Sequence, residues 1–269
     1  MTKFQSTVTK TMRTYPYTRM PDRLEKLYPE LARLPEDDAF GLSERLSAVC
    51  TILGGRDLGT LIDLGGHSGF FAMSLIDVGM ADAATVYDSN REALSAGRAA
   101  AEQMNIAKVE FIERLIDLDF LKSMPAVDTV LCLNLLHHAG TLFDADIVLR
   151  EGWEKYAQAW LGELRQKSRV LVLSLGFKRM TKPPHWDVER PYRPLAFARL
   201  AEKVGWSTVY EANVRDIQAL GVDRANRRFT TSRNLAMVRF HVQKLKEMTS
   251  RLVLGRSERK QHYHLYIFE

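Results

Sequence analysis

The sequence predicts an α/β protein built on a doubly wound, mostly parallel sheet of seven strands, with a helical segment before it and a helical insertion ahead of the last strand. Three observations lead to this prediction. Short apolar runs alternate with helical patterns from Thr60 onward, as parallel strands with helical crossovers require. A glycine-rich turn follows the first run. An alternating strand pattern over 262–268 closes the chain.

Length and composition set the outer limits. The chain has 269 residues, 46% hydrophobic and 26% charged, which fits one enlarged globular domain and excludes wholesale disorder. Its two cysteines, Cys50 and Cys132, are too few for a disulfide framework or a cysteine-ligated zinc site. The first ten residues lack the apolar core of a signal peptide, and no apolar run approaches the roughly 20 residues that span a bilayer. We therefore expect a soluble, cytoplasmic protein.

The elements divide the chain into four parts. Residues 1–57 contain four prolines and helical patterns over 23–34 and 41–53, which predict a helical cap. Residues 58–214 form the predicted core, 215–260 a basic helical insertion, and 261–269 the final strand of the core sheet. Within the core, strands are predicted at 60–64, 85–88, 109–112, 129–133, 170–175 and 207–214. Helices are predicted at 70–79, 91–104, 144–166 and 195–204.

Charge is distributed unevenly along the chain. Residues 1–176 hold 19 basic and 24 acidic residues, and residues 177–269 hold 19 and 9, so the two parts carry −5 and +10. The insertion contributes 12 basic and 4 acidic residues, beside an apolar stripe from Leu235 to Leu252 at spacings of three and four. This asymmetry indicates an anionic partner, with a solvated helix face as the alternative.

The most informative stretch follows the first strand. Asp63 precedes a turn with glycines at 65, 66 and 69 that opens a helix, where backbone N–H groups can approach a ligand. His67 replaces the middle glycine of the dinucleotide fingerprint, which disfavours a pyrophosphate cradle. Asp88 ends the second strand, where a carboxylate can accept hydrogen bonds from both hydroxyls of a ribose. The pattern therefore indicates a cofactor that contains a nucleoside.

These residues and the order of the strands resemble the class I methyltransferases that use S-adenosylmethionine. The resemblance covers 60–214 and 262–268, and it implies that Asp63 helps to hold the ammonium of the cofactor while Asp88 binds its ribose. In this family a polar residue after the third strand receives the adenine amino group; Glu113, Arg114 and Asp117 compete for that role, and we choose Asp117. The residues assigned to the cofactor are Asp63, Gly65, Gly66, His67, Gly69, Asp88, Asp117 and Asn134.

Asn134 ends the fourth strand and is expected to line the same crevice, because parallel strands present their carboxyl ends to one side. The two prolines that usually follow it in methyltransferases of exocyclic base amines are missing. His137 and His138 come next, and a neutral imidazole can take the proton of a hydroxyl near neutral pH. We expect one of them to act as a base. No metal is expected, because consecutive side chains on a strand diverge.

The leading hypothesis is an S-adenosylmethionine-dependent O-methyltransferase acting on a small-molecule or saccharide-like acceptor. The basic insertion is expected to meet an anionic group on that acceptor, and it is also compatible with a peripheral membrane contact. An RNA methyltransferase is the second hypothesis, since the basic third could follow a phosphate backbone. A third is a methyltransferase-like binding protein without catalysis. A nicotinamide-dependent oxidoreductase is disfavoured by the missing glycine.

Overall fold

The computed structural model describes residues 3–15, 18–31, 41–177, 193–225 and 263–269. Seven strands form one sheet, as the sequence predicts, and their order in it is β3-β2-β1-β4-β5-β7-β6. All neighbours are parallel except at β7, which pairs antiparallel with both β5 and β6. The strands are β1 Thr60–Leu64, β2 Ala83–Asp88, β3 Val109–Glu113, β4 Thr129–Leu133, β5 Val170–Gly176, β6 Thr208–Asn213 and β7 Tyr263–Phe268.

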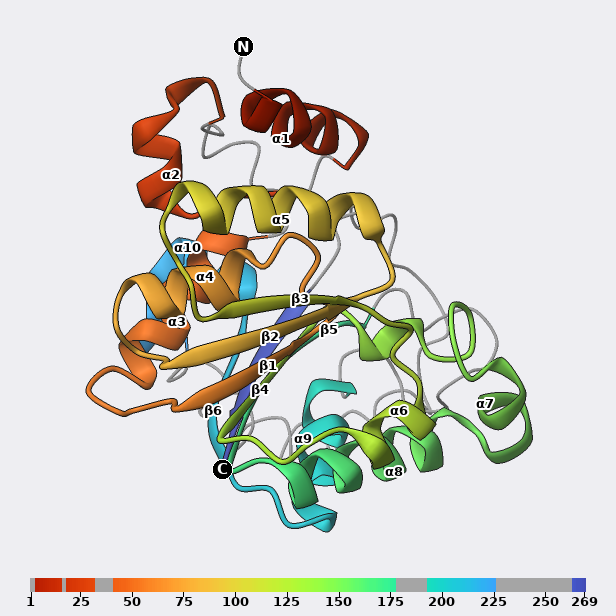
Figure 1. The fold of residues 1–269 in the computed structure, drawn as a ribbon. Coiled ribbons are helices and arrows are strands. Elements are labelled where there is room, and N and C mark those ends of the chain that lie inside the picture. The colour runs from red at the N-terminus through yellow and green to blue at the C-terminus, as the bar shows by residue number, and fades with distance from the viewer. Residues whose placement is uncertain (1–2, 16–17, 32–40, 178–192, 226–262) are drawn as a thin grey trace, which may run out of the picture.

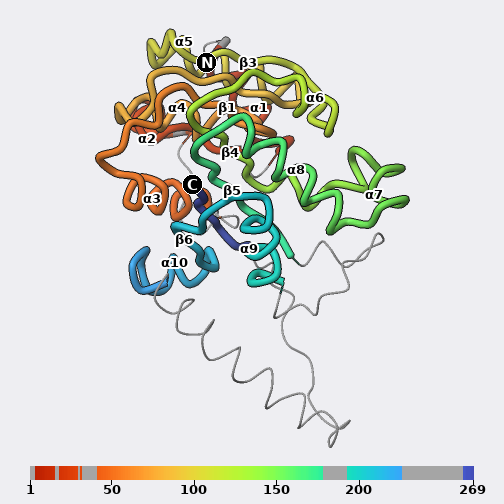
Figure 2. Tube along the Cα trace, turned by 90° about the horizontal axis from the view of Figure 1, so that it is seen from below, coloured from red at the N-terminus to blue at the C-terminus, as the bar shows by residue number. Residues whose placement is uncertain are grey.

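Helices cover both faces of the sheet (Figure 1). The helices α1 Lys3–Thr14, α2 Asp22–Leu27, α3 Leu42–Ile52, α4 Phe70–Asp77, α5 Arg91–Gln103 and α10 Val214–Leu220 lie on one side. The opposite side carries α6 Leu118–Ser123, α8 Trp153–Lys167 and α9 Arg193–Lys203. The short helix α7, Ala145–Glu151, stands at the edge of the molecule (Figure 2). This double covering explains why the strands read as continuous apolar runs.

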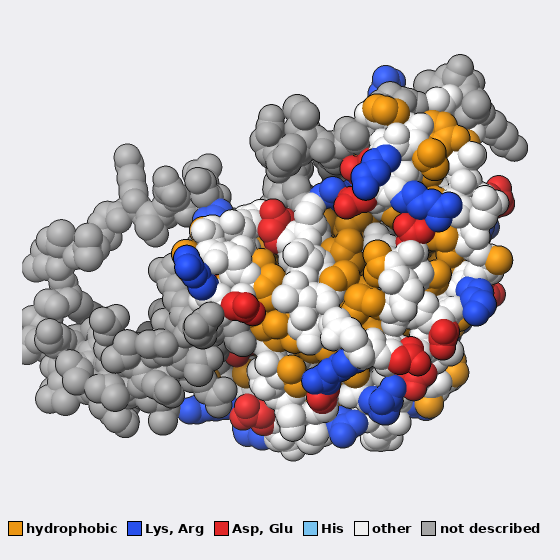
Figure 3. All heavy atoms as spheres, turned by 90° about the vertical axis from the view of Figure 1, so that its left-hand side faces the viewer, with side chains coloured by type: hydrophobic (Ala, Val, Ile, Leu, Met, Phe, Trp, Pro, Cys, Tyr) orange, Lys and Arg blue, Asp and Glu red, His pale blue; other side chains and the backbone are white. Residues whose placement is uncertain are grey.

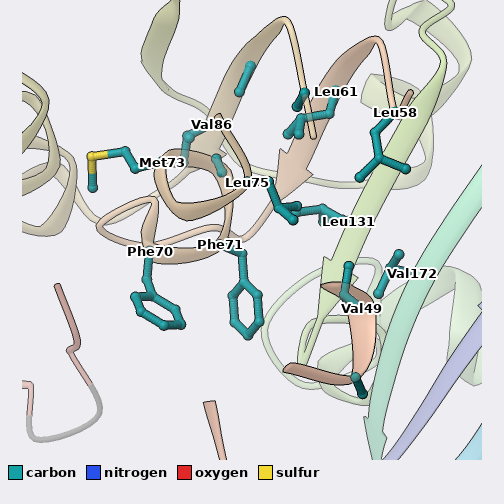
Figure 4. Close-up of a cluster of buried hydrophobic side chains, with 14 of the residues drawn as sticks. Val49, Leu58, Leu61, Phe70, Phe71, Met73, Leu75, Val86, Leu131 and Val172 are labelled. Carbon is teal, nitrogen blue, oxygen red and sulfur yellow. The ribbon is translucent and has the colours of Figure 1, made fainter. Parts of the chain in front are cut away.

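Two buried clusters hold these layers together. One joins the sheet to α3, α4 and α5, with Phe71, Leu75 and Val86 among its members (Figure 4). The other packs α8 and α9 onto the opposite face around Trp160 and Phe197, which are fully buried. Strand β1 pairs with β2 on one side and β4 on the other, and its side chains enter both buried clusters. These contacts fix the strand and the start of the turn that follows it.

Most of the predicted elements are present, with four differences. The helix predicted over 23–34 is shorter: α2 ends at Leu27, Tyr28 leaves the helical conformation, and a 3₁₀ turn covers Pro29–Leu31. The pattern over 144–166 is not one helix: Gly152 adopts a positive φ of 84° and separates α7 from α8. Helix α10 begins at Val214, the last residue of the predicted core, and continues into the stretch expected to be the insertion. The fourth difference is α1, which no pattern in the sequence singled out; it packs along α5 and pairs Lys10 with Glu92 at 3.2 Å.

Most of the basic insertion, including the apolar stripe from Leu235 to Leu252, lies outside the described residues. On the face shown in Figure 3, basic and acidic side chains of the described part are interspersed among hydrophobic ones. That face therefore does not carry the charge asymmetry seen in the sequence. No helix in the described ranges is long and apolar enough to span a membrane.

Candidate active site

The candidate site lies at the carboxyl ends of β1, β2 and β4, where the strand order changes direction between β1 and β4. Open α/β sheets bind ligands in the crevice at such a switch point. The turn after β1 is held against β2 by two backbone bonds: Gly65 and Gly66 donate to the carbonyl of Tyr87 at 2.8 and 3.3 Å. Gly69 then caps α4 in a left-handed conformation (φ 73°).

Gly66 is required for space. A Cβ atom there would lie 2.6 Å from Oδ2 of Asp63 and 2.7 Å from Cγ1 of Val86, closer than side chains approach one another. Gly69 has both a positive φ and the ring of Phe111 at 2.7 Å from the corresponding position. The turn therefore requires glycine at both positions, and its backbone packs directly against the carboxylate of Asp63.

Asp63 is the most perturbed acid of the site. It is 1% exposed, and its Oδ2 is buried without a hydrogen-bond partner. Burial, followed by the nearby charge of Asp88, raises the pKa of Asp63 from its ordinary 3.8 to about 7. A buried carboxylate oxygen without a donor is costly unless a ligand supplies one. The residue thus fits a cationic group such as an ammonium.

Asp88 accepts two backbone hydrogen bonds, from His67 at 2.9 Å and from Asn90 at 2.7 Å. Burial raises its pKa, although those backbone donors oppose the shift. Its carboxylate therefore ties the glycine turn to the end of β2. Each carboxylate oxygen has more than one lone pair, so these bonds leave capacity for hydroxyl donors.

His67 sits in the turn with φ 54°, and burial lowers its pKa to about 4, so its imidazole is neutral near pH 7. The N-terminal segment closes over this point. The ring of Tyr15 meets the His67 ring edge-on at 5.4 Å, and the hydroxyl of Ser68 donates to the carbonyl of Arg19 at 3.2 Å. The guanidinium of Arg19 lies over the ring of Phe70.

At the end of β3 the structure forms an open cavity of about 500 Å³, which Ser89, the residue after Asp88, also lines. Asp117 lines this cavity, but its Oδ1 also accepts the N–H of Phe120 at 2.7 Å and so caps α6. The other two candidates for the adenine, Glu113 and Arg114, line it as well. The assignment of Asp117 stays a prediction.

The end of β4 carries a hydrogen-bonded set that the sequence did not indicate. Asn134 has a positive φ of 65°, and its N–H donates to the carbonyl of Ser174 at 3.0 Å. The hydroxyl of Ser174 donates to Oδ1 of Asn134 at 2.9 Å, and Nη1 of Arg45 lies 3.3 Å from the same hydroxyl oxygen. Arg45 comes from α3, 129 residues away from Ser174, and no local pattern could have linked them.

The expectation that the two histidines diverge is wrong. Leu136–His138 form a 3₁₀ turn instead of extended strand, and the rings of His137 and His138 lie 4.2 Å apart. His137 is buried, and its Nδ1 accepts the N–H of Gly176 at 3.3 Å. A backbone N–H can only donate, so neutral His137 carries its proton on Nε2. His138 is half-exposed. Across the described ranges, no three His, Cys, Asp or Glu side chains cluster as metal ligands would.

Comparison with known proteins identifies the fold. No protein-family model and no curated protein matches the chain. Magnesium protoporphyrin IX methyltransferase (ChlM) from Synechocystis PCC 6803, solved with bound SAM, matches with a TM-score of 0.50 and 12% identity, covering 100% of this chain and 97% of that one. The bifunctional kinase-methyltransferase WbdD matches with a TM-score of 0.48 and 17% identity over 90% of this chain, which spans only 41% of WbdD. The [4+2]-cyclase SpnF matches with a TM-score of 0.46, 12% identity and coverage of 84% and 80%.

The match to ChlM extends over the whole chain, and the strand order and orientation are those that the resemblance implies. The chain therefore has the class I S-adenosylmethionine-dependent methyltransferase fold. A fold by itself does not fix a reaction, so the function has to be argued from the site.

Proposed function

We propose that the protein is an S-adenosylmethionine-dependent methyltransferase that methylates an oxygen of a small-molecule or saccharide-like acceptor with an anionic group. The main support for this cofactor is Oδ2 of Asp63, a buried oxygen without a hydrogen-bond partner. It lies beside the turn that needs glycine at positions 66 and 69. An amino-acid ammonium would supply the missing donor and a compensating charge.

The remaining cofactor contacts follow from the geometry. Asp88 lies at the end of β2 with lone pairs left for ribose hydroxyls, and the cavity beside it has the polar lining that an adenine needs. ChlM was solved with bound SAM and with bound SAH, which supports the same cofactor for this fold. Tyr15, packed on His67, would restrict water at the turn.

When bound, S-adenosylmethionine supplies a methyl carbon whose bond to sulfur breaks, with the electron pair kept by sulfur, as the acceptor oxygen bonds to it. The protein has to orient that oxygen and, where it is a hydroxyl, remove its proton. His137 is unsuited to this, because a second ring proton would sit on Nδ1 against the N–H of Gly176. We therefore assign the role of base to His138, and we assign to His137 the role of holding the His138 ring in place.

Three variants test this assignment with S-adenosylmethionine labelled in the methyl group. His138→Gln should lower turnover by about 10²- to 10⁴-fold, the usual effect of losing a general base. His137→Asn keeps an acceptor for Gly176 and should retain most turnover, whereas His137→Leu should not. Near-wild-type turnover in His138→Gln would rule out this base, and calorimetry of cofactor binding would show whether the fold and the cofactor site are intact.

RNA remains the second candidate acceptor, because the C-terminal third is strongly basic. The labelled cofactor separates the two proposals. After incubation with an extract of the source organism, label in the small-molecule or glycan fraction supports the first, and label that ribonuclease releases supports the second. If wild-type protein binds NADH more tightly than S-adenosylmethionine, the methyltransferase proposal fails.

A further inference from the structure

Arg45 of α3, Ser174 of β5 and Asn134 after β4 form a chain of hydrogen bonds that leads from the protein interior toward the candidate site. Arg45 and Ser174 are both fully buried, and Asn134 at the outer end is half-buried. Nη1 of Arg45 donates to Oγ of Ser174 at 3.3 Å, and Oγ of Ser174 donates to Oδ1 of Asn134 at 2.9 Å. The inner end is held in place, because Nε of Arg45 also donates to the carbonyl of Gly41 at 3.2 Å.

The direction of this chain follows from the groups themselves. A guanidinium has donors only, so Ser174 has to accept from Arg45. The serine has a single hydroxyl proton, and Oδ1 of Asn134 is the acceptor that receives it. If the Asn134 amide were reversed, its nitrogen would also donate to Ser174, and the buried hydroxyl proton would lose that acceptor. Such an unsatisfied buried donor is costly.

The consequence lies at the other end of the amide. With Oδ1 occupied by Ser174, the side chain of Asn134 can offer only the two N–H groups of Nδ2 to a ligand. Nδ2 makes no hydrogen bond within the described residues, and it is not among the buried polar atoms that lack a partner. The backbone of Asn134 is fixed as well, through its bond to the carbonyl of Ser174 at 3.0 Å. Asn134 is therefore preset as a donor.

We infer that Arg45 is a positioning residue that acts through Ser174 to fix Asn134 as a hydrogen-bond donor, and that the acceptor presents a lone-pair oxygen to Nδ2. A carboxylate, carbonyl or hydroxyl oxygen meets this requirement. An amine nucleophile does not, because its one lone pair points at the methyl carbon and its N–H groups would face the N–H groups of Asn134. The inference rests on the proposed function and gives a structural reason for the oxygen acceptor proposed there: Asn134 is set to donate to an oxygen of the acceptor.

Asn134→Asp tests the inference with little change of shape, because it replaces the donor with an acceptor. Asn105→Asp is the matched control: Asn105 is also left-handed (φ 54°) but exposed at the end of α5. With labelled S-adenosylmethionine and an extract of the source organism, Asn134→Asp should lose at least about tenfold in turnover, the effect of one hydrogen bond to a charged or strongly polar group. Ser174→Ala should lose less, because the amide can then rotate. Asn105→Asp should match the wild type.

Chemical analysis of the labelled product is the second readout, and a purely structural role of Arg45 would not predict its result. Label in a methyl ester or methyl ether supports the inference. Label on nitrogen overturns it together with the proposed oxygen acceptor, while methyl transfer from S-adenosylmethionine still stands. The oxygen could instead belong to the cofactor. Calorimetry with S-adenosylhomocysteine decides this. Unchanged affinity in Asn134→Asp means that the oxygen belongs to the acceptor, whereas a loss of affinity as large as the loss of turnover overturns the assignment of Nδ2 to the acceptor.

The direction of the hydrogen bonds can also be observed without any acceptor. Neutron diffraction from a deuterated crystal of the full chain should locate the deuterium of Ser174 between Oγ and Oδ1 of Asn134. Deuterium on the Asn134 amide pointing toward Ser174 would overturn the inference. Failure of the wild type to bind either S-adenosylmethionine or S-adenosylhomocysteine would refute the proposed function, and the inference would fall with it.

Discussion

Replacing Asp63 with asparagine should reduce the loss of folding stability that occurs as the pH rises. The pKa of Asp63 is raised from 3.8 to about 7 in the folded chain. The folded state therefore holds this proton more tightly than the unfolded state, and ionisation of Asp63 costs stability as pH rises between those two values. One pH unit corresponds to about 1.4 kcal/mol, so the cost is about 1.7 kcal/mol near pH 5 and about 4 kcal/mol near pH 8. The Asp63→Asn substitution removes this cost, because an amide does not ionise.

The measurement is urea unfolding of both proteins near pH 5 and near pH 8. The free energy of unfolding of Asp63→Asn, relative to wild type, should rise by about 2.5 kcal/mol between the two. Any constant cost of the new amide cancels in this difference. Asp128→Asn serves as the control, because the N–H of Thr60 lowers the pKa of Asp128 and its contribution is already constant above pH 5. Equal pH profiles for wild type and Asp63→Asn would refute the reasoning.

Two further predictions concern the cofactor and the acceptor. Asp88→Ala should weaken S-adenosylmethionine binding by about 1 to 3 kcal/mol in calorimetry, because a half-buried charged hydrogen-bond partner is lost; unchanged affinity would remove Asp88 from the site. Neutralising three arginines at the start of the insertion should raise the acceptor KM and flatten its dependence on salt, since attraction between exposed charges is screened over about 8 Å at physiological salt. The three arginines are Arg224, Arg227 and Arg228. A KM of the wild type that does not depend on salt would contradict an anionic acceptor.

The sheet could be predicted from the sequence because each of its signals is local. Buried parallel strands read as apolar runs, and the turn from Asp63 to Gly69 combines an acid and glycines within seven residues. The break at Gly152 was also local, but a lone glycine within a helical pattern is often tolerated, so it did not outweigh the periodicity around it. The roles of single residues within that frame were harder to predict.

Long-range contacts account for what the sequence did not reveal. Ser174 joins Asn134 across 40 residues and Arg45 across 129, and a serine inside an apolar strand has no pattern that indicates such partners. The same limit applies to His137 and Gly176, which are 39 residues apart. The sequence identified the pair of histidines, but only the packing of β5 beside β4 separates an oriented histidine from a half-exposed one.

The two acids of the site also bear on the choice between the rival cofactors. In a dinucleotide-binding fold the turn after the first strand receives an anionic pyrophosphate at a helix N-terminus. Here the turn packs its backbone against Asp63, since a Cβ atom at Gly66 would lie 2.6 Å from Oδ2 of that carboxylate. A pyrophosphate at this point would add negative charge beside Asp63, whose pKa burial and, after it, the charge of Asp88 already raise. An ammonium relieves the same repulsion. Electrostatics therefore favours a cofactor that is cationic at the turn and carries its ribose near Asp88, which is the pattern of S-adenosylmethionine.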